Sequence, residues 1–352
     1  MNQQVNVGII GYGLAGRVFH TPLIAGIPGF RIAKIVTTDP SRMAAVEERY
    51  PGTQIVSDAD SIFKDENISL VIVASPNEFH YEHSRQALLH NKHVVSDKPF
   101  TVTSAEADEL IEIARKKKLL LTAFQNRRWD SDFLTIKKLI GSGRLGTIVE
   151  AEIHFDRFKN FIKPNNWKEE SRPGTGIHFD LGIHLVDQAQ ELFGLPGSIT
   201  GFLLKQRNLG QTIDNFEILL HYPQLKVTLK TGLLVRVPLP KYIITGQSGT
   251  FVKYGMDMQE AQLDSGMKPG DILYGTESEA YFGKLYYESD NKPVIETIGS
   301  ECGNYSAFYQ NVFSAIVDGE KLLVDPVEAR NNIRMIELAV LSSEEKRTLD
   351  FV

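Results

Sequence analysis

The sequence predicts an α/β protein with two domains. The first has a doubly wound parallel sheet, and the second is an α/β domain with a large open, mainly antiparallel sheet. Up to residue 123, short apolar runs alternate with helical patterns, as a parallel sheet covered on both faces requires. After residue 129, several strands follow one another across short turns. The 352 residues suit two domains, which we place at 1–123 and 124–352.

Composition sets limits on the class of protein. The chain is 42% hydrophobic and 23% charged, as expected of a globular protein with a full core. A net charge of −6 and a pI near 5.9 argue against nucleic-acid or membrane partners. Cys302 is the only cysteine, which excludes an internal disulfide and a cysteine-based metal site. No signal peptide or long apolar run is recognisable, so we expect a cytoplasmic protein.

A glycine-rich turn follows the first predicted strand, residues 5–10, and precedes a helical pattern over 17–25. This is the G-x-G-x-x-G fingerprint between a strand and a helix, typical of a dinucleotide-binding Rossmann unit. Its glycines allow a tight turn, close approach of a pyrophosphate and close helix packing. A merely structural turn is the alternative. The predicted cofactor contacts here are Gly11, Tyr12, Gly13, Leu14, Ala15 and Gly16.

The end of the second predicted strand, residues 30–36, bears on the choice of cofactor. NAD-binding units usually place an acidic residue here to hold the ribose 2′-hydroxyl. Thr37 stands at that position, followed by Thr38 and shortly afterwards by Arg42. Hydroxyl groups and an arginine leave room for a 2′-phosphate and can donate to it. We therefore predict NADP, with NAD possible because Asp39 could be a displaced ribose ligand.

Further predicted strands, at 69–74, 93–96 and 119–123, also end in polar residues. Strand-end loops of a doubly wound sheet are where a dinucleotide lies. Lys98 follows an apolar strand and precedes a proline, which places it on the ligand side. Ser104 is the predicted cap of the next helix. The histidines at 80, 83, 90 and 93 are interpreted as loop and helix-surface residues. Further cofactor candidates are Ser75, Pro76, Asn77, His80, Asp97, Lys98 and Gln125.

The second domain begins with a predicted helix at 132–141 and a long strand at 147–157. Residues 255–283 have little periodicity and are predicted to form an excursion, equally well a lid or a subunit contact. Closing helices are expected at 304–318 and 327–343, with the option of packing back on the first domain. One face of the antiparallel sheet could pack on a partner subunit, so we predict a homodimer or homotetramer. The other predicted strands are 198–204, 215–221, 226–235, 242–245 and 250–253.

A helical stretch at 171–193 interrupts these strands and carries Asp180 and His184 four residues apart. On a helix, such residues project from the same face. A carboxylate beside an imidazole suits proton transfer near neutral pH. The alternative is a structural Asp–His pair. His178 could complete a metal site only with further ligands, and none is evident, so no metal is expected.

The motifs GYGLAG, SPNEFH, DKP and GTGIHFDLGIHLVD together resemble the Gfo/Idh/MocA oxidoreductases, and the resemblance covers essentially the whole chain. The family's Glu-Lys-Pro has aspartate at position 97 here, which keeps the lysine. Its G-x-x-x-D-x-G-x-H pattern matches Gly176, Asp180, Gly182 and His184. Within the family, NRRWDSDFLTIKKLI looks like the NADP-dependent scyllo-inositol dehydrogenase branch, although an arginine expected after the two threonines is Asp39.

The resemblance implies hydride transfer between a nicotinamide cofactor and a small sugar or polyol. Lys98, Asp180 and His184 would be the catalytic residues, in a cleft between the domains. His184 would be the base, Lys98 would stabilise the alkoxide, and Asp180 would bind the substrate hydroxyl. Alternatives are a reductase of another carbonyl compound and a non-catalytic NADP-sensing regulator.

Residues beyond this triad carry further predictions. Trp167 and Gln125 are predicted to contact the cofactor, and Asn126 and Arg127 the substrate. A loop anchor is the alternative for Trp167, and an interdomain hinge for the stretch from Gln125 to Trp129. Asp156, Arg157 and Lys159 could meet sugar hydroxyls, though solvated charge is the favoured interpretation.

Overall fold

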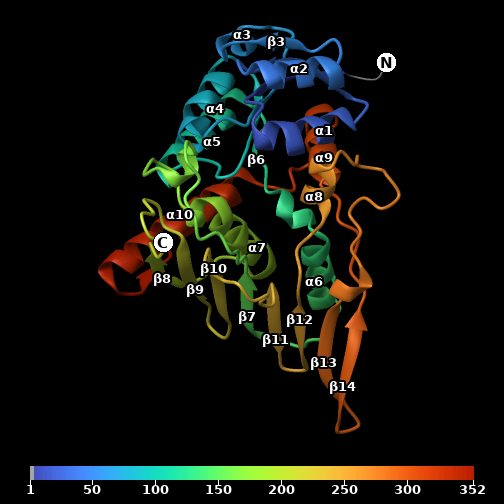
Figure 1. The fold of residues 1–352 in the computed structure, drawn as a ribbon, viewed down its shortest axis with the longest axis vertical. Helices are drawn as coiled ribbons and strands as arrows, with labels where there is room; N and C mark the ends of the chain where they lie inside the picture. The colour runs from blue at the N-terminus through green and yellow to red at the C-terminus, as the bar shows by residue number, and fades with distance from the viewer. Residues whose placement is uncertain (1–3) are drawn as a thin grey trace. The chain divides into compact units, whose positions relative to one another are not determined.

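The computed structural model describes residues 4–352 (Figure 1). The chain forms two compact units. The first contains the chain up to Asn126, together with Gln259–Tyr274 and Asn304–Asn331. The second contains Arg127–Met258, Gly275–Gly303 and Asn332–Val352. The domain limits 1–123 and 124–352 stay a prediction.

The first unit is built on a six-stranded sheet with the order β3-β2-β1-β4-β5-β6. Every neighbouring pair in it is parallel, so the predicted doubly wound parallel sheet is confirmed. The central strand Leu70–Val73 is apolar throughout and fully buried, as in a sheet covered on both faces. The strands are β1 (Val5–Ile10), β2 (Phe30–Val36), β3 (Gln54–Val56), β4 (Leu70–Val73), β5 (His93–Ser96) and β6 (Leu121–Ala123).

Helices connect these strands, and the first one starts in the π form. Thr103 rather than Ser104 caps α5, because its hydroxyl accepts from the Glu106 amide while the Glu106 carboxylate accepts from the Thr103 amide. The helices are η1 (Ala15–His20), α1 (Thr21–Ala25), α2 (Pro40–Arg49), α3 (Asp60–Phe63), η2 (Asn77–Phe79), α4 (His80–Leu89), α5 (Ser104–Lys117), α8 (Gln259–Asp264) and α9 (Ser306–Val317).

Residues 255–283, predicted to be an excursion, are divided between the two units. Helix α8 contacts η1, and Asp264 forms an ion pair with Arg17 at 3.1 Å. The buried Gln259 accepts a hydrogen bond from the Tyr305 amide. Gln259–Tyr274 is therefore packed into the first unit, because buried anchors such as Gln259 and Leu263 outweigh its polar composition.

The second unit contains a nine-stranded sheet with the order β14-β13-β12-β11-β7-β10-β9-β8-β15. Only β7 and β10 pair in parallel, so the predicted mainly antiparallel sheet is confirmed. The strands are β7 (Ile148–His154), β8 (Ser198–Leu204), β9 (Asn215–His221), β10 (Lys226–Gly232), β11 (Tyr242–Gly246), β12 (Gly249–Lys253), β13 (Gly283–Ser289), β14 (Lys292–Ile298) and β15 (Leu349–Asp350).

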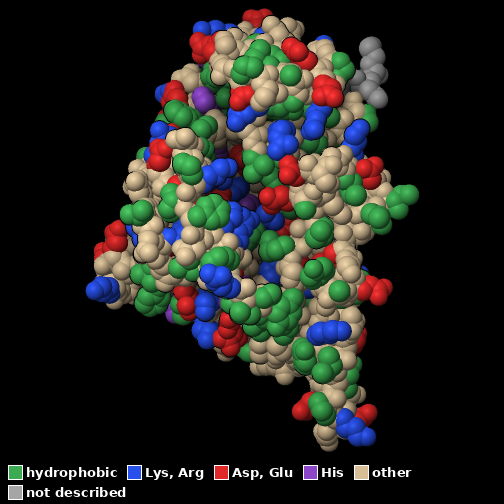
Figure 2. All heavy atoms as spheres, in the orientation of Figure 1, with side chains coloured by type: hydrophobic (Ala, Val, Ile, Leu, Met, Phe, Trp, Pro, Cys, Tyr) green, Lys and Arg blue, Asp and Glu red, His purple; other side chains and the backbone are tan. Residues whose placement is uncertain are grey.

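One face of this sheet is buried and the other is open. Along β9, Phe216, Ile218 and Leu220 are buried and alternate with half-buried residues. On the hairpin of β13 and β14, Tyr286 and Ile295 are paired on the open face and exposed. Figure 2 shows hydrophobic side chains among charged ones over this hairpin.

The second unit has fewer helices than the first. Helix α10 (Pro326–Glu345) begins in the first unit and continues into the second. The turn η3 (Asn126–Trp129) likewise spans the boundary between the units. The remaining helices are α6 (Ser131–Gly141), η4 (Trp167–Glu169), η5 (His178–Gly182), α7 (Ile183–Phe193) and η6 (Glu279–Tyr281).

Candidate active site

The carboxyl ends of five parallel strands in the first unit lie in register. Ile10 is paired with Val36 on one side and with Val73 on the other. Val73 is paired with Ser96, which is paired with Ala123. The residues that follow each strand therefore emerge along one edge of the sheet. The predicted residues at this edge are Gly11–Gly16, Thr37, Thr38, Ser75, Pro76, Asn77, Asp97, Lys98, Gln125 and Asn126.

The glycine-rich turn has the backbone that a pyrophosphate site needs. Gly11 has φ +101°, and a Cβ there would lie 2.5 Å from the Ala74 carbonyl oxygen. A Cβ on Gly16 would lie 2.3 Å from the Gly11 carbonyl oxygen, whereas one on Gly13 would meet no described atom within 4 Å. No described side chain caps the start of η1. Open space before uncapped amides suits a dinucleotide pyrophosphate.

Asp39 is already engaged at the end of β2. Its carboxylate caps α2, accepting from the backbone amides of Ser41 at 2.9 Å and Arg42 at 3.1 Å. Hydrogen bonds from the Ser41 hydroxyl and the Arg42 amide lower the pKa of Asp39. Thr37 is buried, while Thr38 and Arg42 are exposed. This cap function accounts for Asp39 without a ribose contact.

Lys98 lies next to a buried chain of polar groups, and the Lys98–Pro99 peptide bond is cis. Asp97 accepts a hydrogen bond from the Lys98 amide at 2.7 Å, and its other oxygen lies 3.7 Å from His20 Nε2. The opposite ring nitrogen of His20 contacts the Tyr309 hydroxyl at 2.6 Å. Burial by itself raises the pKa of Asp97. His20 and Lys98 together lower this pKa by more than burial raises it, so the net shift is downward. An ionised Asp97 thus holds the Lys98 backbone.

His80 is buried, so its interpretation as a surface residue is wrong. Its two ring nitrogens lie 2.7 Å from the Pro99 carbonyl oxygen and 2.8 Å from that of Ser75. These contacts join the loops that follow β4 and β5. The prediction that His80 contacts the cofactor stays a prediction, and the contacts give it a role in ordering both loops.

In the second unit, a turn leads into the helix that carries Asp180 and His184. Gly174 and Gly176 have φ of +73° and +99°, and the Gly176 carbonyl accepts from the Asp180 amide at 3.0 Å. Asp180 lies in the π-helical η5 and His184 one turn later in α7. The Asp180 side chain is 36% exposed, whereas His184 is buried. The carboxylate is therefore accessible to a ligand.

The neighbouring His178 differs from this pair. It is buried and packs against Phe179, with ring centroids 4.7 Å apart. Burial lowers the pKa of His178 to about 4, so its imidazole is neutral near pH 7. No group of three or more potential metal ligands occurs within residues 4–352.

Arg127 and Arg157 flank the buried Phe155 ring. Their guanidinium carbons lie 4.9 Å and 5.0 Å from its centroid. Arg127 also contacts Asp130 at 3.4 Å, and its backbone carbonyl accepts from the Gln188 amide. Stacking and hydrogen bonding thus fix the orientation of Arg127.

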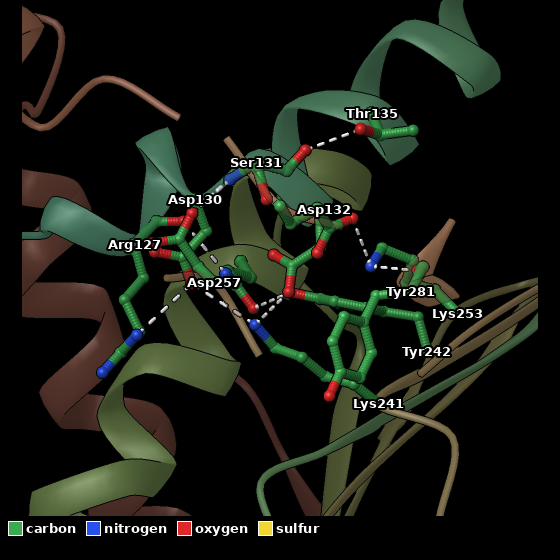
Figure 3. A network of polar contacts seen from close by, with 12 residues as sticks. Arg127, Asp130, Ser131, Asp132, Thr135, Lys241, Tyr242, Lys253, Asp257 and Tyr281 are labelled. Atoms are coloured by element: carbon green, nitrogen blue, oxygen red, sulfur yellow. Dashed lines mark hydrogen bonds and ion pairs between the residues drawn. The ribbon is translucent and has the colours of Figure 1, made fainter. Parts of the chain in front are cut away.

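A buried charged network lies next to Arg127 (Figure 3). Lys241 contacts Asp132 at 2.6 Å and Asp130 at 3.3 Å, and all three side chains are almost fully buried. Burial lowers the pKa of Lys241, but Asp132 reverses that effect and the net shift is upward. Asp257 accepts from the Ser131 amide at 2.8 Å. The network fixes the start of α6, directly after η3.

Lys98 belongs to the first unit, whereas Arg127, Trp167, Asp180 and His184 belong to the second. Sequence reasoning did not identify the contacts of His20, Lys168 or Lys241. Their partners Asp97, Asp180 and Asp132 lie far away in the chain or across an irregular loop, where periodicity gives no signal. No helix within residues 4–352 is long and apolar enough to cross a membrane.

The parallel sheet and the glycine fingerprint define a protein with a dinucleotide-binding Rossmann domain. Residues 5–125 match the description "Oxidoreductase family, NAD-binding Rossmann fold", and residues 137–351 match "Oxidoreductase family, C-terminal alpha/beta domain". The chain belongs to the Gfo/Idh/MocA oxidoreductase family.

Full-length relatives support this membership. The chain is 39% identical to the scyllo-inositol 2-dehydrogenase (NADP(+)) IolW of Bacillus subtilis, over 98% of this chain and 95% of the relative. It is 40% identical to the Escherichia coli oxidoreductase YdgJ, over 99% of both chains. The solved structure of the Bacillus subtilis oxidoreductase yvaA superposes with a TM-score of 0.94 at 38% identity, covering 99% of this chain and 100% of the other.

Proposed function

We propose that this oxidoreductase transfers a hydride between a nicotinamide cofactor, preferably NADP, and a ring hydroxyl of a cyclitol or sugar such as scyllo-inositol. The observation that carries the proposal is the Asp180–His184 pair, with its accessible carboxylate and buried imidazole at the start of one helix. The similarity to a scyllo-inositol 2-dehydrogenase (NADP(+)) supports the substrate class and the cofactor.

The proposed chemistry assigns each side chain a separate task. A nicotinamide cofactor, when bound, would supply the acceptor for the hydride that leaves the alcohol carbon. His184 removes the hydroxyl proton as the general base, and Asp180 binds the hydroxyl and orients it toward the imidazole. Lys98 donates a charged hydrogen bond to the developing alkoxide. All three groups act on the same alcohol in this proposal.

The same proposal assigns the cofactor to the strand-end residues. The amides of Gly11–Gly16 would hold the pyrophosphate, and Thr37, Thr38 and Arg42 the 2′-phosphate. Ser75, Pro76, Asn77, Asp97 and Gln125 would border the nucleotide, as would Trp167. Asn126 and Arg127 would contact the substrate. The engagement of Asp39 as a helix cap supports NADP over NAD.

An assay of NAD⁺ and NADP⁺ against inositol isomers and hexoses tests the function. We expect NADPH to form from NADP⁺ with at least one cyclitol or sugar. Cofactor binding without turnover of any of these alcohols, in either direction, would contradict the proposal. Turnover with NAD⁺ alone would contradict the assignment of Thr37, Thr38 and Arg42.

Replacing Arg42 with alanine should weaken NADPH binding about tenfold or more, the effect of losing a charge-assisted hydrogen bond to phosphate. NADH binding should change less than about twofold, because NADH has no 2′-phosphate. Fluorescence titration of both cofactors measures the two affinities. Arg115→Ala, on the exposed side of α5, is the matched control. Equal weakening of both cofactors would contradict the assignment.

The open sheet face suggests how copies of the chain associate. Phe202 and Leu204 on β8 and Tyr286 and Ile295 on the β13–β14 hairpin are exposed on this face. Exposed apolar residues spread along one sheet suit a homodimer or homotetramer. Light scattering should therefore give a mass of two or four chains of 39.5 kDa. A monomer at micromolar concentration would exclude this arrangement.

A further inference from the structure

Lys168 forms an ion pair with Asp180. Its Nζ lies 2.8 Å from Asp180 Oδ1, and the two side chains are 45% and 36% exposed. Lys168 directly follows Trp167 in the short turn η4. The ammonium group therefore contacts the carboxylate that the proposed function assigns to the substrate hydroxyl.

Buried groups anchor the loop that carries Lys168. Arg207 donates to the Phe161 carbonyl at 2.9 Å and to the carboxylate of Glu169, the next residue after Lys168, at 2.7 Å. Its Nε donates to Asp214 at 3.0 Å, and the Arg207 and Asp214 side chains are only 2% and 1% exposed. Because Arg207 holds both the loop before η4 and the last residue of η4, the fold itself places Lys168 beside Asp180.

Several other titratable groups lie near Asp180 or on an element that contacts η5. Lys159 lies earlier in the same loop. Burial and the charge of Arg157 lower its pKa, and the charge of Asp180 opposes that shift. His178 in η5 is neutral near pH 7. Strand β10 contacts η5, but its lysines form ion pairs with acidic residues of neighbouring strands. These pairs are Lys226–Glu150 and Lys230–Glu217.

We infer that Lys168 is a positioning residue, which orients the Asp180 carboxylate and places a positive charge beside the Asp180–His184 pair. This inference rests on the proposed function of that pair. A nearby cation disfavours the protonated imidazole. His184 would therefore remain neutral, and able to accept a proton, at lower pH than it would in the absence of Lys168. Lys168 would thus extend activity toward lower pH.

An NMR titration of the imidazoles tests the inference without requiring turnover. The chain has nine histidines, so a His184→Asn variant identifies the His184 signal. In Lys168→Met, we expect the His184 midpoint to move upward by about half a pH unit, a modest shift because the ion pair is partly exposed. Lys168→Arg should retain the wild-type midpoint. Lys163→Met removes an exposed lysine from the same loop and should also leave the midpoint unchanged.

The pH dependence of kcat/KM for alcohol oxidation supplies a second readout. The acid limb of Lys168→Met should move upward by the same amount, which lowers kcat/KM about threefold on that limb. High salt should move the wild-type limb in the same direction, because salt screens an exposed pair, but should have little effect on Lys168→Met. A purely structural role would lower activity equally at every pH.

An unchanged His184 midpoint in Lys168→Met, or an equal shift in Lys163→Met, would overturn the inference. These outcomes are distinguishable from failure of the proposed function. That failure would appear as a wild-type protein that oxidises none of the alcohols with either cofactor, whatever the NMR titration shows.

Discussion

Replacing His184 with alanine should lower kcat for alcohol oxidation by about 10²- to 10⁴-fold, the usual contribution of a general base. Alanine cannot accept the hydroxyl proton. Hydride transfer from an alcohol that keeps this proton would leave a protonated carbonyl, which is charged and unstable. The buried position of His184 also keeps bulk water from replacing the imidazole efficiently. Initial rates of NADPH formation with scyllo-inositol, measured from pH 6 to pH 10, provide the comparison.

Two controls separate loss of the base from loss of the fold. The affinity of His184→Ala for NADPH should stay within about twofold, because His184 is not assigned to the nucleotide. His221→Ala removes a histidine on the open sheet face that contacts Thr200, and it should retain near-normal turnover. Near-normal turnover of His184→Ala would show that another group is the base.

Five of the six strands of the first sheet were predicted, and most of these end in a local signal, whereas the three-residue strand β3 was not predicted. Gly11 follows Ile10, Thr37 follows Val36 and Asp97 follows Ser96, so apolar runs and polar ends give the strand limits directly. The hairpin of β13 and β14 was not predicted, although its turn contains Asp290 and Asn291. Aspartate and asparagine are residue types that tolerate a positive φ, and both have one here. Many of its side chains are exposed or charged, and this weakens the alternation that marks a half-buried strand.

The candidate site likewise contains some relations that were predictable from the sequence and others that were not. The placement of Asp180 and His184 one turn apart was predictable, because they are only four residues apart in the sequence. Their catalytic roles stay predictions. The contact between His20 and Tyr309 joins residues 289 positions apart, and Lys241 and Asp132 are 109 positions apart. Only the folded chain brings such residues together. Lys168 is close to Asp180 in sequence, but the loop between them has no period and depends on Arg207.

Replacing Lys241 with methionine should lower the free energy of unfolding by about 3–5 kcal/mol, since it leaves the buried Asp132 carboxylate without the cation that contacts it. Asp130 and Asp132 are fully buried, and Lys241 contacts both. Burial raises the pKa of Asp132, and Lys241 opposes that effect. Without Lys241, Asp132 should take up a proton more readily. The loss of stability should therefore be smaller at pH 5 than at pH 8, as urea denaturation at both values would measure.

Lys226→Met is the matched control, because it breaks a lysine–carboxylate pair in the same sheet. Lys226 pairs with Glu150, but these side chains are 53% and 41% exposed, so its loss should cost less than about 1 kcal/mol. In Lys241→Met, Asp132→Asn should restore part of the stability by removing one unpaired charge. Equal costs for both lysines would mean that water reaches the network. A cost confined to Lys241 would mean that Asp130, and through it Arg127, depends on a desolvated ion pair for its position.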